Sequence, residues 1–111
     1  MAGAILIAES GATKAEWCLL TNGRKTPVVT QGISPYFFTE QKIIDMVGEE
    51  LFPHFPKSAR IEEIHYYGTG MRNPDNVKMI KRAFHKLLPD AEIEISDDML
   101  AAARALNGTS K

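Results

Sequence analysis

The sequence has one cysteine, no long apolar run and no excess of either charge, and each of these absences excludes a class of protein. A single cysteine, Cys18, cannot form a disulfide within the chain, and its place in an apolar run is typical of a buried, unreactive thiol. The apolar runs fall far short of the roughly 20 residues that a membrane-spanning helix needs, and the N-terminus lacks a basic segment followed by an apolar one. We therefore expect a soluble, cytoplasmic protein with no membrane partner.

The charges of the chain are balanced. It has 13 basic and 14 acidic residues, a formal net charge of −1 and no long block of one sign. A protein that binds nucleic acid needs a basic track along the phosphate backbone, so no nucleic-acid partner is expected. With 111 residues the chain has the length of one domain, and a fold of this size buries roughly 60–70% of the surface that the unfolded chain exposes. We expect one domain over residues 1–108.

The apolar pattern predicts an α/β fold built on a mixed sheet. Asn22 and Gly23 stand between two apolar segments and predict a tight hairpin, since both residues tolerate positive φ. Thr39 and Asn73 are candidate N-caps of two helices, and Asp97 or Asp98 of a third. Strands are expected at residues 4–8, 15–20, about 27–31, 61–67 and 91–95. The order is then β-β-β-α-β-α-β-α.

A short polar insert separates the first two predicted strands. The segment "ESGATK", residues 9–14, contains an acid, two hydroxyl residues, a glycine and a lysine. The segment is expected at the tip of a hairpin, where the backbone amides of Gly11 and its neighbours are not committed to the sheet ladder. Together with the hydroxyls and Lys14, such amides are groups that bind a phosphate. Glu9 has the charge to hold Mg²⁺ or its water shell. Taken alone, a polar hairpin loop of this kind is more often an ordinary solvated turn.

Two further motifs carry polar groups at predicted strand ends. In "SDDMLAAARAL" one aspartate suffices as a helix N-cap, and the other could point into a cleft and accept a proton from a hydroxyl group. The turns "GISPYFF" and "YYGTGMRNPD" contain glycines and groups that suit a sugar, although turns favour the same residue types. These groups are the side chains of Ser34, Tyr66, Thr69 and Asn73.

In this order, the motifs resemble those of the N-acetylglucosamine kinase and BadF/BadG/BcrA/BcrD ATPase family, within the actin-like, sugar kinase and Hsp70 superfamily. Bacterial members look like "DSGSTKTDWCLV", where this chain has "ESGATKAEWCLL", and like "GINPF", where it has "GISPY". Near the end they look like "DDLLAAARAL", where this chain has "DDMLAAARAL". The resemblance covers nearly the whole chain and is carried by several motifs in one order.

The resemblance implies a ribonuclease H-like fold of the actin-like ATPase type, with a five-stranded sheet, helices on both faces and a second domain beyond Lys111. It implies ATP and Mg²⁺ as cofactors, a sugar as substrate and Asp98 as the base that takes the proton of the sugar hydroxyl; Asp97 would be a cap or a supporting residue. Glu9 would hold the metal. The remaining implied contacts are Ser10, Gly11, Ala12, Thr13 and Lys14 around the phosphates, and Ser34, Gly68 and Thr69 toward the sugar.

Several functions remain open at this point. The leading interpretation is the N-terminal domain of an ATP-dependent sugar kinase, with this domain inactive by itself. The alternatives are a BadF-type ATPase that couples hydrolysis to a partner protein, and a non-catalytic interaction domain. A metal-dependent nuclease would use Glu49 or Glu50 as a further acid, but the basic track is missing. A homodimer is a further option, because the aromatic segment at residues 36–38 and the alanines of the last predicted helix could contact another subunit.

Overall fold

The computed structural model describes residues 3–11, 13–36, 38–57, 59–68 and 70–97. It contains five strands and two α-helices. The strands are β1 (Gly3–Ser10), β2 (Lys14–Thr21), β3 (Arg24–Gln31), β4 (Arg60–Gly68) and β5 (Glu92–Ser96). The helices are α1 (Glu40–Met46) and α2 (Pro74–Leu87), and α1 continues into a π-helical segment, Val47–Leu51, and a 3₁₀ turn, Phe52–His54.

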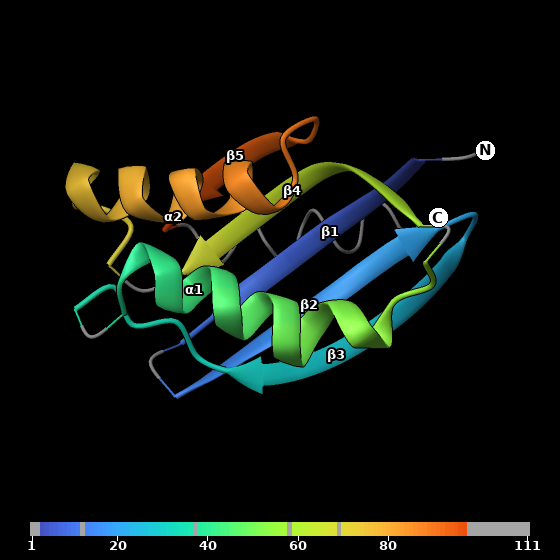
Figure 1. Cartoon of the computed structure of the whole chain (residues 1–111), viewed down its shortest axis with the longest axis horizontal. Helices are drawn as coiled ribbons and strands as arrows, with labels where there is room; N and C mark the ends of the chain where they lie inside the picture. The colour runs from blue at the N-terminus through green and yellow to red at the C-terminus, as the bar shows by residue number, and fades with distance from the viewer. Residues whose placement is uncertain (1–2, 12, 37, 58, 69, 98–111) are drawn as a thin grey trace.

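The strands form one mixed sheet in the order β3-β2-β1-β4-β5 (Figure 1). β2 is antiparallel to both β1 and β3, whereas β4 is parallel to both β1 and β5. The five-stranded mixed sheet predicted from the sequence is therefore confirmed. The predicted third helix, with the cover it would give to the second face of the sheet, lies outside the described residues, and the ribonuclease H-like assignment stays a prediction.

Local sequence signals set the ends of these elements. Asn22 and Gly23 adopt φ of 47° and 79° and join β2 to β3 by a two-residue turn, as predicted. The Thr39 side chain accepts a hydrogen bond from the Lys42 amide at 3.1 Å and caps α1. Asn73 caps α2 in the same way and is followed by a proline at the first helical position.

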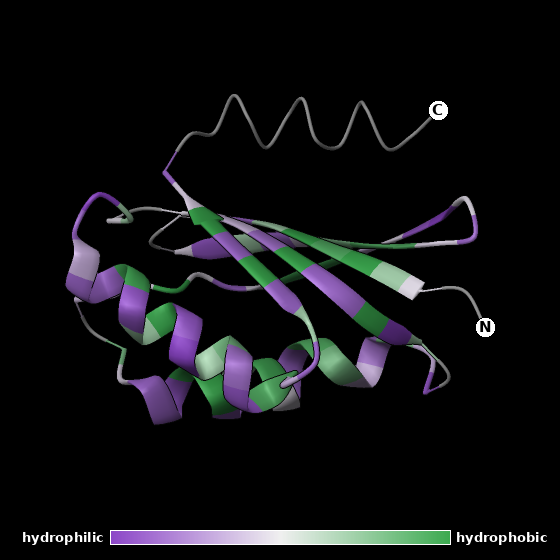
Figure 2. Ribbon diagram, turned by 90° about the horizontal axis from the view of Figure 1, so that it is seen from above, coloured by the Kyte–Doolittle hydropathy of each residue, from purple (hydrophilic) through white to green (hydrophobic). Residues whose placement is uncertain are grey.

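Both described helices lie on the same face of the sheet and turn their apolar sides toward it (Figure 2). The centre of this layer is aromatic: the rings of Trp17 and Phe84 meet edge to face at 6.1 Å, and Tyr66 lies 5.6 Å from Phe84. On the opposite face, Ile7 and Tyr67 form a smaller buried cluster. No helix in the described part of the chain has the length and apolar composition to cross a membrane.

Candidate functional site

A cleft of about 570 Å³ lies at the carboxyl ends of β1, β4 and β5. These three strands are parallel, so their ends meet at one edge of the sheet, where open α/β sheets bind their ligands. The residues that form the cleft therefore come from segments that are separated along the sequence, between Ser10 and Asp97. Its lining residues are Ser10, Gly11, Tyr36, Gly68, Gly70, Arg72, Asn73 and Asp97.

The turn after β1 is shorter than predicted. β1 runs on through Ser10 and β2 begins at Lys14, because the antiparallel register continues to the Ser10–Ala15 pair. The amide of Gly11 donates to the carbonyl of Lys14 at 2.9 Å and closes the turn. The expectation that the Gly11 amide is available to a phosphate is therefore wrong for this structure. Ala12, which was also predicted to contact phosphate, lies outside the described residues.

Ser10 connects two loops rather than facing solvent. Its side chain is fully buried, and its hydroxyl accepts the amide hydrogen of Ile33 at 2.9 Å. The same hydroxyl donates to the carbonyl of Gly11 at 3.0 Å. Ser10 thus holds the turn after β1 against the loop that follows β3. Its predicted contact with phosphate would require its hydroxyl to change partners.

The other predicted phosphate and metal residues lie beside the cleft and do not line it. Glu9 is half-buried and, by strand alternation, points to the face opposite the helices, as Ile7 does. Thr13 and Lys14 are exposed, and the Lys14 ammonium lies 3.9 Å from the Glu16 carboxylate. One half-buried carboxylate suits Mg²⁺, which keeps several waters and takes its other ligands from the phosphates of a nucleotide.

The predicted sugar contacts are only partly at the cleft. Gly68 lines it, whereas Ser34 is 8% exposed and does not line it; the Ser34 carbonyl accepts a hydrogen bond from the Phe38 amide. Thr69 lies outside the described residues. Tyr66 was expected to offer a hydroxyl to a sugar; the structure places its ring in the core with no exposed surface, so this expectation is wrong. Asn73 does line the cleft while it caps α2.

The sequence analysis missed Arg72. Its Nε donates to the Oδ2 of Asp97 at 2.6 Å and ties the segment before α2 to the end of β5. Arg72 is 93% exposed, so its guanidinium can also meet a ligand that enters the cleft. The only sequence signal was a basic residue four positions after the glycine that ends β4. Asp98, the predicted base, lies outside the described residues, whereas its neighbour Asp97 is at the cleft.

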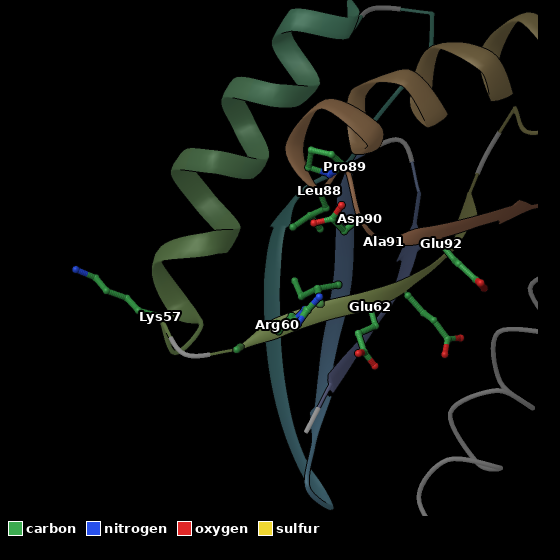
Figure 3. Close-up of a pocket in the computed structure, with 11 residues that line it drawn as sticks. Lys57, Arg60, Glu62, Leu88, Pro89, Asp90, Ala91 and Glu92 are labelled. Carbon is green, nitrogen blue, oxygen red and sulfur yellow. The ribbon is translucent and has the colours of Figure 1, made fainter. Parts of the chain in front are cut away.

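A second hollow, of about 650 Å³, lies at the opposite end of the parallel strands. Figure 3 shows it between the beginning of β4 and the turn from α2 to β5, with Lys57 pointing away from the other labelled side chains. It is lined by acids and bases together, among them Arg60, Glu62 and Asp90. Glu50, the acid that a nuclease would need, lies elsewhere and accepts hydrogen bonds from the Gln31 backbone and side chain.

A comparison with solved structures supports the fold. No protein-family model matches the chain, and no curated protein matches it. Among solved structures, the chain is similar to a protein of Porphyromonas gingivalis described as the "Putative N-acetylglucosamine Kinase", with 36% identity and a TM-score of 0.76. The similarity covers 94% of this chain and 38% of that one, so the chain spans little more than a third of the other protein's length. The resemblance inferred from the motifs is thereby confirmed.

Proposed function

We propose that this chain, which is similar along nearly its whole length to an N-acetylglucosamine kinase-type protein, is the N-terminal domain of a sugar kinase. The whole protein would transfer the γ-phosphoryl group of ATP to a sugar hydroxyl in the cytoplasm. The similarity to the Porphyromonas gingivalis protein carries this proposal, since an identity of 36% reflects more than a shared fold. The cleft at the carboxyl ends of β1, β4 and β5 supports it.

In this proposal the turn after β1 faces the nucleotide. Glu9 would hold Mg²⁺ together with the ATP phosphates, and the ion would neutralise charge that develops on the transferred group. Lys14 would bring a positive charge to the phosphates if it leaves Glu16, an exposed partner at 3.9 Å that holds it weakly. Ser10, Gly11, Ala12 and Thr13 would shape the turn. Catalysis by these groups consists of positioning and charge stabilisation.

The sugar would lie over the ends of β4 and β5. Asp98 would accept the proton of the attacking hydroxyl as the new oxygen–phosphorus bond forms and the bond to ADP breaks. Ser34, Gly68 and Thr69 would line the path of the sugar. Arg72, at the same edge, holds Asp97 next to the proposed base, and this pair would restrict how the end of β5 moves.

The test is ATP turnover by the two-domain protein that the proposal requires, measured with N-acetylglucosamine, with glucose and without sugar. We expect sugar-dependent turnover that falls at least about 100-fold in Asp98→Asn, the contribution typical of a general base. Asp97→Asn is the matched control: the amide oxygen of asparagine can still accept from Arg72, so turnover should fall far less than in Asp98→Asn.

Turnover that does not depend on sugar would overturn the kinase assignment in favour of a BadF-type ATPase. If neither nucleotide nor sugar binds to that protein, the chain is a non-catalytic interaction domain. A sugar-dependent wild type with an unaffected Asp98→Asn variant would keep the kinase and remove Asp98 as its base.

A further inference from the structure

Tyr36 adds an exposed aromatic ring to a cleft whose lining is otherwise polar. Tyr36 and Val29 are the exposed large apolar side chains in the described part of the chain, with 68% and 63% of their surface exposed. An isolated apolar side chain on a protein surface needs no explanation, and Val29 on β3 is of this kind. Tyr36, in contrast, lines the cleft, where the other lining residues are glycines or carry hydroxyl, amide or charged groups. Its ring is therefore placed where a ligand would cover it.

The loop between β3 and α1 holds Tyr36 in position. Ile33, at the start of this loop, is fully buried, and its amide donates to the Ser10 hydroxyl at 2.9 Å. The carbonyl of Ser34 accepts a hydrogen bond from the Phe38 amide at 2.9 Å and closes the turn that contains Tyr36. The ring therefore stands on a fixed backbone, and a ligand would not have to order the loop when it binds.

A second loop approaches Tyr36 from the end of β4. A Cβ placed on Gly70 would lie 2.9 Å from Cγ of Pro35 and 3.6 Å from the Tyr36 hydroxyl oxygen. A side chain at position 70 would thus push the two loops apart. The carbonyl of Gly70 also accepts a hydrogen bond from the Asn73 amide at 3.2 Å. Tyr36 therefore lies beside the segment that leads from β4 to α2 and carries the polar groups of the cleft.

The neighbouring Phe38 does not extend the exposed ring into a larger apolar patch. It is half-buried and packs against the hydrophobic core, with the Lys42 ammonium 4.7 Å from the centre of its ring. A surface that binds another protein subunit presents a contiguous apolar area. A single ring within a polar lining fits a small ligand better than a protein partner.

The lining matches the two kinds of surface that a sugar ring presents. A pyranose has hydroxyl groups around its edge and a flat face of C–H groups. Asn73 and Asp97 carry groups that form hydrogen bonds with hydroxyls, and the electron-rich face of an aromatic ring attracts C–H hydrogens. We propose that Tyr36 binds the sugar by stacking its ring against the C–H face of the pyranose. This inference rests on the proposed function and adds a residue that is not among the predicted sugar contacts.

The test is the turnover assay of the two-domain protein with N-acetylglucosamine, applied to Tyr36→Leu and Tyr36→Phe. Leucine is apolar but has no flat ring, so the KM for the sugar should rise about 3- to 10-fold, the effect of one aromatic contact. The kcat should change much less, because stacking holds the sugar equally in the bound state and in the transition state. Tyr36→Phe keeps the ring and should restore the KM to within about twofold of the wild type.

Val29→Ala is the matched control, because it removes the other exposed large apolar side chain and does not touch the cleft lining. Its KM for the sugar should equal that of the wild type. The KM for ATP should be the same in all variants, which separates stacking on the sugar from stacking on the adenine ring. Melting temperatures should also stay unchanged, since both positions are exposed.

Each other outcome overturns the inference in a recognisable way. Sugar-dependent turnover with a wild-type KM for the sugar in Tyr36→Leu would remove Tyr36 from the sugar site and leave the proposed function standing. A rise in the KM for ATP alone would show that the ring meets the nucleotide. An equal loss in Tyr36→Phe would assign the contact to the hydroxyl, and a much lower melting temperature of Tyr36→Leu would make it a structural contact. Turnover by the wild type that ignores sugar would refute the proposed function, and the inference with it.

Discussion

Replacing Gly68 with alanine should destabilise the chain, because Tyr66 fills the space that a side chain would need. The new Cβ would lie 2.6 Å from Cε1 of Tyr66, 2.8 Å from its hydroxyl oxygen and 2.9 Å from Cζ. Ordinary carbon contacts are longer, near 3.5–4.0 Å, so the ring or the strand would have to shift by roughly 1 Å. Tyr66 cannot move away freely, since it has no exposed surface and packs against Phe84.

The expected cost is that of overpacking a core, about 1–3 kcal/mol, against a total stability of about 5–15 kcal/mol for a domain. Urea unfolding followed by fluorescence measures it directly, because Trp17 is the only tryptophan and is 2% exposed. Gly48→Ala is the matched control. A Cβ there meets nothing within 4 Å, and alanine should be neutral or stabilise the helical segment by up to about 1 kcal/mol.

A double-mutant cycle identifies Tyr66 as the cause. Tyr66→Leu removes the three atoms that crowd position 68, so Gly68→Ala should cost at least about 1 kcal/mol less in that background. The reasoning is refuted if Gly68→Ala behaves as Gly48→Ala does, or if the two changes at positions 66 and 68 are additive.

Three further predictions concern single residues. Burial lowers the pKa of His65, but its hydrogen bonds to Glu94 and Glu63 outweigh this and raise the pKa above 6.5. The resulting stabilisation of the folded state, about 1 kcal/mol or less, is therefore complete below about pH 6.5 and is lost as pH rises through the raised pKa. The urea midpoint of the wild type should fall over this pH range, whereas that of His65→Gln should not. The same pH dependence in both proteins would contradict the prediction. Asn73→Ala should cost about 1 kcal/mol in urea unfolding, because it removes the N-cap of α2, whereas Asn73→Asp should keep the cap; equal losses would refute the capping role. Gly23→Ala should lower the melting temperature by several degrees, since φ is 79° there, and an unchanged value would argue against the turn.

The sequence predicted those features that depend on neighbours along the chain. The Asn22–Gly23 turn and the caps at Thr39 and Asn73 involve residues within three positions of each other, so local chemistry determines them. The length of the turn after β1 was not predictable in this way. Glu9 and Lys14 look like loop residues, but pairing between strands places them in strands. Glu9 and Ser10 pair with β2 and β4, and Lys14 pairs with β3.

Tertiary contacts decided the rest of the site. Tyr66 and Tyr67 are adjacent, and alternation requires them to face opposite sides of the sheet. Both sides offer apolar neighbours at this point, so the residue type could not show which ring lies under the cleft. The pair between Arg72 and Asp97 spans 25 residues and depends on β5 lying beside β4. No local pattern encodes such a contact.

The order of the strands also has a consequence for how the chain folds. β1, β2 and β3 are joined by turns of three and two residues, so this meander can pair early, at little loop-closure entropy. The pairing of β1 with β4 joins Ser10 to Gly68, and it has to wait for a much longer segment to close. The floor of the cleft is made by that late pairing. A partly folded chain, even one with an intact meander, therefore has no cleft, and a ligand of the cleft would select the fully folded state and slow its unfolding.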